Sequence, residues 1–173
     1  EIANPGKLAE ITVGCTIREA KSGKVVHTEP TKVGNLANID KFPFAGAFAI
    51  PDCRLWSPED PFLYELSLGT GADAVKVRFG MRSFSFDPKT KRAILNGKPY
   101  IMRGTNVTAY RFFEDEARGD KPWRAEWVRR LHQACKTMHW HCIRYCIGFP
   151  PDFWYDIADE EGFLIQDEFP IWN

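Results

Sequence analysis

The sequence predicts a mixed fold, with an all-β sandwich over residues 1–87 and the beginning of a parallel α/β domain over residues 88–173. Short alternating apolar runs fill the first half, whereas the second half changes to helical spacing. Strand and helix signals of the second half also alternate in the order β-α-β-α-β. At 173 residues, the chain is long enough for one or two domains with a buried core.

Alternation of apolar and polar residues marks the strands of the first half. Residues 11–17 alternate in this way, which is typical of a half-buried strand. A turn signal at residues 22–24 predicts a returning strand that begins at Val25. Residues 75–86 close the half with another alternating pattern. Many short strands in under 100 residues predict a small antiparallel sandwich.

The first elements of the second half are a hairpin and an apolar strand. Asn96 and Gly97 form a two-residue turn signal, and the strand after it ends near Asn106. A polar loop then precedes a helix start signal at Asp120 and Pro122. The helix that follows carries a packing stripe at steps of three and four, formed by Trp123, Trp127, Leu131, Ala134, Cys135 and Met138.

The remaining elements are a strand, a short helix and a last strand. Residues 141–146 predict the second strand, and Asp152 is expected to cap the helix after it. Gly162 follows this helix where a left-handed residue is needed. Residues 163–166 form a continuous apolar run, as expected for a strand covered on both faces. This order predicts parallel strands joined by right-handed crossovers.

Two architectures begin in this way, a doubly wound sheet and a (β/α)8 barrel. The first strand-to-helix connection lacks the GxGxxG fingerprint, and its long polar loop suits a barrel, where such loops build the active site. A barrel needs about 250 residues, and 86 residues follow residue 87. We therefore expect the first three strands and two helices of an incomplete (β/α)8 barrel. The alternative is a compact three-stranded α/β unit that is itself a complete small domain.

Composition argues against several classes of partner. The 23 basic and 23 acidic residues balance, so no charge excess indicates nucleic acid or an anionic membrane as a partner. No apolar run approaches the roughly 20 residues of a membrane-spanning helix. No signal peptide is visible at the start of the chain. The compartment is unassigned, although a periplasmic or extracellular parent protein is compatible with the sequence.

The five cysteines are an odd number, so at least one is unpaired or bonded to another molecule. Cys142 and Cys146 are four positions apart in one predicted strand, roughly 13 Å, which is too far for a disulfide. Cys15 and Cys53 are compatible with a disulfide across the sandwich, and buried thiols are the alternative.

A cluster in the second half has the residue types of a zinc site: His139, His141, Cys142 and Cys146. The two histidines share one strand face and Cys142 takes the other, so a single tetrahedral site is hard to build. We expect no metal and no cofactor.

Three segments resemble glycoside hydrolase family 2, the family of β-galactosidases, β-glucuronidases and β-mannosidases. Residues 55–68, LWSPEDPFLYELSL, look like the family's Trp-Ser-Pro-x-x-Pro-x-Leu-Tyr segment. Residues 78–84 and 95–106 are similar to the join between the family's sandwich and barrel. Residues 141–168 are similar to its second strand, second helix and third strand. The resemblance implies that the sandwich is immunoglobulin-like.

The activity that the resemblance implies is retaining hydrolysis of O-glycosidic bonds. One carboxylic acid protonates the glycosidic oxygen while a carboxylate about 5 Å away attacks the anomeric carbon. In the family, the acid/base Glu follows an Asn at the end of strand four, and the nucleophile Glu ends strand seven. Neither strand is expected in this chain, and no Asn-Glu pair occurs in it. We therefore expect a fragment with no catalytic residue of its own, inactive alone, whose parent protein binds a carbohydrate substrate.

Four polar residues are candidates for substrate binding or active-site support. The resemblance implies that Arg144 hydrogen-bonds the nucleophile and keeps it ionised, and an ordinary ion pair is the alternative. Asp167 and Glu168 close the third strand, where they contact sugar hydroxyls, support Arg144 or cap the next loop. Adjacent strand residues point to opposite faces, so at most one of the two faces a barrel interior. Asn106 contacts substrate or forms a turn.

A fifth candidate is Trp172, because loop aromatics at a barrel mouth can stack on sugar rings, and Trp154 has the same alternative. The family often has a His after the first strand and a His-Tyr-Pro after the second. Here Thr108 and the Ile147-Gly148 region replace the histidines. This departure leaves the sugar unassigned.

Two hypotheses from other classes remain open. A non-catalytic carbohydrate-binding module would expose aromatic side chains in residues 1–87, but the only Trp there, Trp56, is expected to be structural. A structural spacer that orients the barrel is our expectation for the sandwich itself. An incomplete parallel sheet has an open edge, so we also expect edge pairing or self-association.

Overall fold

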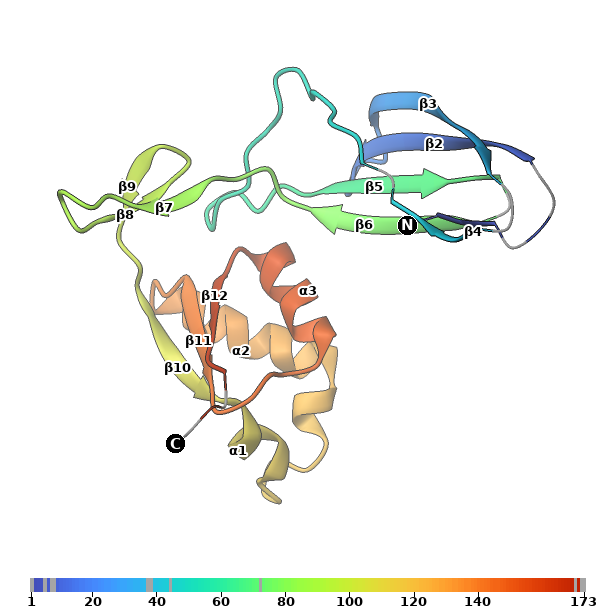
Figure 1. Ribbon diagram of the computed structural model, residues 1–173. Helices are drawn as coiled ribbons and strands as arrows, with labels where there is room; N and C mark the ends of the chain where they lie inside the picture. The colour runs from blue at the N-terminus through green and yellow to red at the C-terminus, as the bar shows by residue number, and fades with distance from the viewer. Residues whose placement is uncertain are drawn as a thin grey trace. The chain divides into compact units, whose positions relative to one another are not determined.

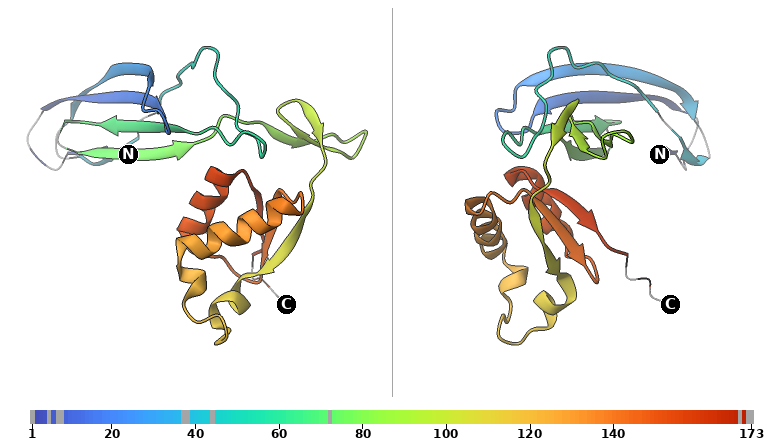
Figure 2. Two further views of the ribbon diagram at one scale, coloured as in Figure 1. Left: turned by 180° about the vertical axis from the view of Figure 1, so that it is seen from behind. Right: turned by 90° about the vertical axis from the view of Figure 1, so that its left-hand side faces the viewer.

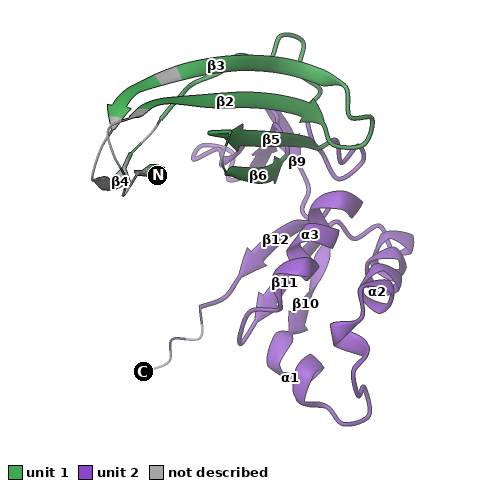
Figure 3. Ribbon diagram, turned by 90° about the vertical axis from the view of Figure 1, so that its right-hand side faces the viewer, with its two compact units in different colours: residues 1–54, 63–79 green, residues 55–62, 80–173 purple. Residues whose placement is uncertain are grey.

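The computed structural model describes residues 2–4, 6, 9–36, 39–43, 45–71, 73–169 and 171, and most of its elements are β-strands. Contacts divide the chain into two compact units, residues 1–54 with 63–79 and residues 55–62 with 80–173 (Figure 3). The division falls before residue 87 because the strand at residues 84–86 pairs within the second unit. No helix among the described residues is long and apolar enough to cross a membrane.

The first unit contains a four-stranded antiparallel sheet with the order β3-β2-β5-β6 (Figure 1). Its strands are β2 (Ala9–Glu19), β3 (Val25–Leu36), β5 (Tyr64–Gly69) and β6 (Ala74–Phe79). A separate two-stranded sheet pairs β1 (Ile2–Asn4) with β4 (Ile39–Phe42).

The hairpin of β2 and β3 confirms two predictions. Val13, Cys15 and Ile17 are all buried, as the alternation along this strand predicts. The predicted turn lies between the two strands, where Gly23 adopts a φ of +73°. The backbone N–H of Glu19 donates to the carbonyl of Lys24 at 2.9 Å and closes the turn.

The second unit begins its regular structure with a three-stranded antiparallel meander. Its strands are β7 (Phe84–Phe86), β8 (Ala93–Leu95) and β9 (Lys98–Tyr100). Asn96 and Gly97 connect β8 to β9 with φ values of +50° and +76°. Positive φ at both positions is the signature of a type I′ turn, so the predicted hairpin is confirmed.

A three-stranded parallel sheet with the order β10-β11-β12 follows (Figure 1). The strands are β10 (Gly104–Thr108), β11 (Cys142–Cys146) and β12 (Leu164–Asp167). Helix α2 (Ala125–Thr137) connects β10 to β11, and α3 (Asp152–Glu161) connects β11 to β12. The predicted alternation of parallel strands and helices is therefore confirmed for this segment.

Three local predictions were wrong. The loop after β10 contains helix α1 (Ala109–Glu114), and the predicted start signal at Asp120 and Pro122 begins a 3-10 turn, η1 (Lys121–Trp123), ahead of α2. Trp123 therefore precedes the helix and is 60% exposed instead of packing in its stripe. Asp152 does not cap α3, because Pro151 takes the N-cap position and Asp152 is the first helical residue.

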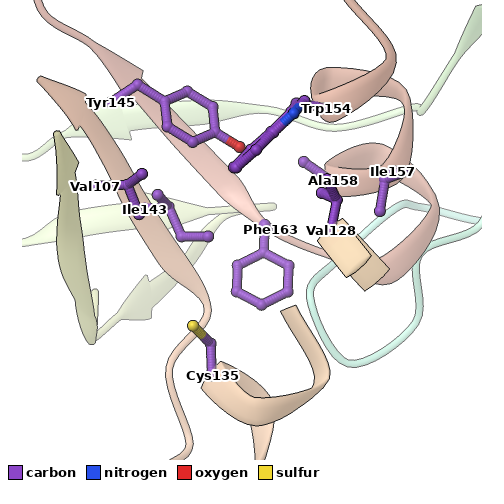
Figure 4. Close-up of a cluster of buried hydrophobic side chains, with 9 residues drawn as sticks. All are labelled: Val107, Val128, Cys135, Ile143, Tyr145, Trp154, Ile157, Ala158 and Phe163. Carbon is purple, nitrogen blue, oxygen red and sulfur yellow. The ribbon is translucent and has the colours of Figure 1, made fainter. Parts of the chain in front are cut away.

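The core of the second unit lies between the parallel sheet and its two long helices. Figure 4 shows the nine fully packed side chains: Val107, Val128, Cys135, Ile143, Tyr145, Trp154, Ile157, Ala158 and Phe163. They come from one face of the strands and from the facing sides of α2 and α3. Figure 2 shows both helices on this face, and no helix of the described residues covers the opposite face of the sheet.

The segment at residues 55–62 packs against the end of α3. The indole Nε1–H of the fully buried Trp56 donates to the carbonyl of Asp159 at 2.9 Å. The Arg82 guanidinium lies 4.6 Å from the centre of the indole ring. Gly162 ends α3 in the predicted left-handed conformation, and a Cβ there would lie 2.5 Å from the carbonyl oxygen of Pro58.

Candidate functional site

Strand register decides which candidate residues share the helix-free face of the parallel sheet. Ile143 and Tyr145 of β11 belong to the core, so Cys142, Arg144 and Cys146 point to the opposite face. Pairing across the sheet then sets three rows on that face. They are Gly104–Cys142–Leu164, then Asn106–Arg144–Gln166, then Thr108–Cys146 with Glu168 just beyond β12.

An ion pair connects the second row to the third. The Nη2 atom of Arg144 lies 3.0 Å from Oε1 of Glu168. The other carboxylate oxygen of Glu168 accepts the backbone N–H of Ile147 at 3.3 Å. Glu168 is also fixed through its backbone, whose N–H donates to the carbonyl of Tyr145 at 2.9 Å. Each carboxylate oxygen thereby has one partner, and Arg144 is held at the carboxyl end of β11.

The peptide that binds Glu168 belongs to a strained turn. Ile147 has a φ of +58°, which is rare for a β-branched residue, and Gly148 follows at +119°. Strain of this kind costs on the order of 1–3 kcal/mol and persists where surrounding contacts impose it. Here the turn directs the Ile147 N–H to the Glu168 carboxylate.

A cleft of about 810 Å³ lies over the helix-free face. The first two rows line it together with residues of the meander and of the loops before and after it, namely Arg82, Phe84, Phe86 and Met102. Its volume lies in the range of small-molecule sites in proteins. Burial raises the pKa of the Cys142 thiol in this wall, so it stays protonated at neutral pH and is a poor nucleophile.

Asp167 and Glu168 lie on opposite faces, as expected for adjacent strand residues. One Asp167 oxygen accepts the hydroxyl of Tyr155, a residue of α3, at 2.8 Å. Burial, followed by this bond, raises the pKa of the Tyr155 hydroxyl. Asp167 therefore faces the helices. Because its side chain points away from the cleft, it is not a cleft residue.

The aromatic candidates also need revision. Trp154 is 1% exposed, and its Nε1–H donates to the carbonyl of Pro122 at 2.9 Å, so it packs in the core and is not a sugar platform. Trp172 lies outside the described residues. Trp56 is fully buried, as expected for a structural tryptophan, and so is not an exposed platform in residues 1–87.

The alternative of a zinc site at His139, His141, Cys142 and Cys146 has no support among the described residues. Within the described part of the chain, no three His, Cys, Asp or Glu side chains come together to hold a metal. His139 lies in a turn with a φ of +57°, outside the strand in which the prediction placed it. Cys15 and Cys53 are both free thiols, so the alternative of a disulfide between them is wrong.

Gln166 is a cleft residue that sequence reasoning missed. The apolar run at residues 163–166 predicts it at the end of a covered strand, yet it is exposed and lies level with Asn106 and Arg144. Gln166 lies two positions from Leu164 and two from Glu168. Strand alternation therefore predicts that all three side chains point to the same face of the sheet.

The chain is similar in sequence to known glycosidases. The family model described as "Glycosyl hydrolases family 2" matches residues 3–82. A β-galactosidase of Oenococcus oeni is 29% identical over 132 residues, which are 72% of this chain and 12% of that protein. A β-galactosidase of Halalkalibacterium halodurans is 28% identical over 131 residues, covering 70% of this chain and 12% of that protein.

A solved structure shares the fold over nearly the whole chain. The crystal structure of the Bacteroides uniformis β-glucuronidase matches with a TM-score of 0.77 and 25% identity, covering 95% of this chain and 20% of that one. The chain thus spans about 12% of the length of the curated relatives it matches. Sequence and structure together show that the chain is similar to members of glycosyl hydrolase family 2 over most of its length.

Proposed function

We propose that this chain is part of a retaining glycosidase and contributes an immunoglobulin-like sandwich and the first three strands of a (β/α)8 barrel. The antiparallel sheet of the first unit, the parallel sheet of the second and the similarity to glycosidases support this reading. The helix-free face of β10–β12 then faces the interior of the barrel. The carboxyl ends of these strands face the active site, where barrel enzymes place their chemistry.

The observation that carries the proposal is the position of Arg144. It lies on the helix-free face near the carboxyl end of β11, and Glu168 holds it there at 3.0 Å. A guanidinium has five N–H donors, and the Glu168 contact leaves others free to point into the cleft. A cation at this position stabilises a carboxylate in its ionised form, which a glycosidase nucleophile requires.

Asn106 and Glu168 complete the proposed support for the site. Asn106 is exposed on the same row as Arg144 and offers an amide to substrate hydroxyls. Glu168 is proposed to act through Arg144, because one of its oxygens pairs with that guanidinium and the other accepts the Ile147 N–H. Trp172 stays a proposed substrate contact on the basis of sequence alone. The acid/base and nucleophile carboxylates are proposed to come from later strands of the parent protein.

Kinetics of the full-length protein test this proposal. We expect hydrolysis of at least one aryl β-glycoside, and a fall in kcat/KM on the order of 100-fold for Arg144→Ala. The matched control is Arg124→Ala, which breaks an exposed ion pair to Asp120 outside the cleft and should leave kcat/KM unchanged. A protein that cleaves no glycoside, or that tolerates Arg144→Ala as well as Arg124→Ala, contradicts the proposal.

A further inference from the structure

The side chain of Gln166 occupies an unusual position in β12. Its neighbours two positions away on the same face are Leu164 and Glu168, and it lines the cleft. The residues beside it in the strand, Ile165 and Asp167, face the helices, where Ile165 packs against the core. An uncharged amide therefore follows two apolar residues of β12 and occupies the position that faces the cleft beside Arg144.

Within the described residues, neither Gln166 nor Asn106 has a hydrogen-bonding partner for its side-chain amide. They flank Arg144 on neighbouring strands, with backbones roughly 4.8 Å from its own. Arg144 is directed toward Glu168, one row further on. The two amides are thus left to bind something that enters the cleft.

The chemistry of an amide suggests what that ligand is. A glutamine side chain offers two donor hydrogens and a carbonyl acceptor, so it can bind a hydroxyl group in either direction. In the proposed barrel this position is covered, and an amide buried without a partner is unfavourable. A sugar hydroxyl relieves that cost only while substrate is bound.

We propose that Gln166 is a specificity-determining residue that hydrogen-bonds a hydroxyl group of the sugar in this cleft. The inference rests on the proposed function and adds to it a named contact between enzyme and sugar. The inference also gives different roles to Gln166, in β12, and Glu168, just after it. Gln166 contacts the sugar, whereas Glu168 acts only by positioning Arg144.

The test compares two substitutions in the full-length protein, Gln166→Leu and Gln133→Leu, which change the two glutamines of this chain. Gln133 is exposed on α2, so Gln133→Leu makes the same chemical change away from the cleft. Each protein is assayed with an aryl glycoside of the cleaved sugar and with its monodeoxy analogues. We expect Gln166→Leu to lower kcat/KM by about 3- to 10-fold, the effect of one neutral hydrogen bond, and Gln133→Leu to change nothing.

The deoxy series identifies the bond. One analogue should react poorly with the unmodified protein, and Gln166→Leu should cause no further loss on it, because the hydroxyl and the amide are partners. Equal loss on every analogue together with a lower Tm overturns the inference, because Gln166 then bonds another strand of the barrel. No loss on any substrate also overturns it.

Calorimetric titration with the free monosaccharides separates this inference from the proposed function. A protein that binds a sugar less tightly after Gln166→Leu but cleaves no glycoside supports the contact and refutes the glycosidase. Hydrolysis that Gln166→Leu leaves intact refutes only the contact. A full-length protein that binds no sugar by this measurement and cleaves none refutes both.

Discussion

At the scale of single residues, the site depends on one carboxylate that has two partners. Glu168 accepts the Ile147 N–H through one oxygen and pairs with Arg144 through the other. The first contact comes from a residue with a positive φ, so a strained turn lies next to the carboxylate that holds the arginine. Asp167, its neighbour in sequence, bonds Tyr155 on the other face and takes no part in this arrangement.

Replacing each carboxylate in turn tests this division of roles. In the full-length protein, Glu168→Ala should lower kcat/KM by about 10- to 100-fold, because Arg144 loses the contact that fixes it. Asp167→Asn keeps an acceptor for Tyr155 and should stay within about threefold of the unmodified protein. A similar fall in kcat/KM for both variants would show that Asp167 and Glu168 do not differ in function although they lie on opposite faces of the strand.

A second residue, His132, makes stability depend on pH. It is fully buried on α2, and neither ring nitrogen has a partner among the described residues. Burial, then the nearby Arg129 and Lys136 charges, lowers the pKa of His132 to about 4. The unfolded chain, with a pKa near 6.5, binds the proton more readily. Stability is therefore complete above about pH 6.5 and falls as the pH decreases toward 4.

Urea unfolding at pH 7 and pH 4.5 measures this effect. The lowered pKa of His132 corresponds to a loss of at most about 3 kcal/mol in the free energy of unfolding at low pH. We expect His132→Phe to remove most of the difference in free energy of unfolding between the two pH values. His139→Asn, at an exposed position with positive φ, is the control and should retain the difference. An equal pH dependence in the His132 variant would contradict the assignment.

At the scale of elements, the end of α3 is fixed by a backbone contact that only glycine allows. Gly162 has a φ of +78°, and an added Cβ would clash with the Pro58 carbonyl at 2.5 Å. The same region receives the indole hydrogen bond of Trp56. The segment at residues 55–62 is therefore tied to the turn between α3 and β12, close in sequence to the residues that hold Arg144.

Alanine at Gly162 should destabilise the protein by about 2 kcal/mol or more, the sum of left-handed strain and displaced backbone. Gly119 provides a matched control, because its φ is +55° but nothing lies within 4 Å of an added Cβ. Gly119→Ala should cost only about 1 kcal/mol. Denaturant unfolding of both variants measures the difference, and equal costs would show that the Pro58 contact yields without penalty.

Most of these elements could be predicted, because their signals are periodic. Alternation predicted β2, the type I′ turn predicted the hairpin of β8 and β9, and the apolar stripe predicted α2. Helix α1 was missed because six residues are too few to show a period. Asp152 was misread because Pro151 fixes the extended residue before α3 and moves the helix start by one position.

The site was only partly predictable for a physical reason. The sequence places Arg144, Asp167 and Glu168 on strands, and alternation shows that the two acids point in opposite directions. Which acid faces the arginine depends on the register between β11 and β12, a long-range property that no local pattern contains. The same register is needed to place Gln166 beside Arg144.

At the scale of the whole molecule, β10 and β12 form the two edges of the parallel sheet among the described residues. Parallel sheets are normally covered on both faces, and here only one face has helices. The chain also spans only about a fifth of the solved relative it matches. These facts agree with a sheet that more strands extend in the parent protein.

The isolated chain should therefore be inactive on glycosides and prone to associate through its open edge. Light scattering over a range of concentrations should show an average mass that rises with concentration. Strictly monomeric scattering would contradict the open edge. Hydrolysis by the purified chain would contradict the proposal that the catalytic carboxylates lie elsewhere.

The central claim is that the parent protein is a retaining glycosidase whose arginine site is built on these three strands. Proton NMR of the first sugar released by the full-length protein tests it most directly, because a glycosyl-enzyme intermediate preserves the anomeric configuration. We predict that a β-glycoside first releases the β-anomer and that Arg144→Ala slows this release. Initial release of the α-anomer, or of no sugar at all, would contradict the account.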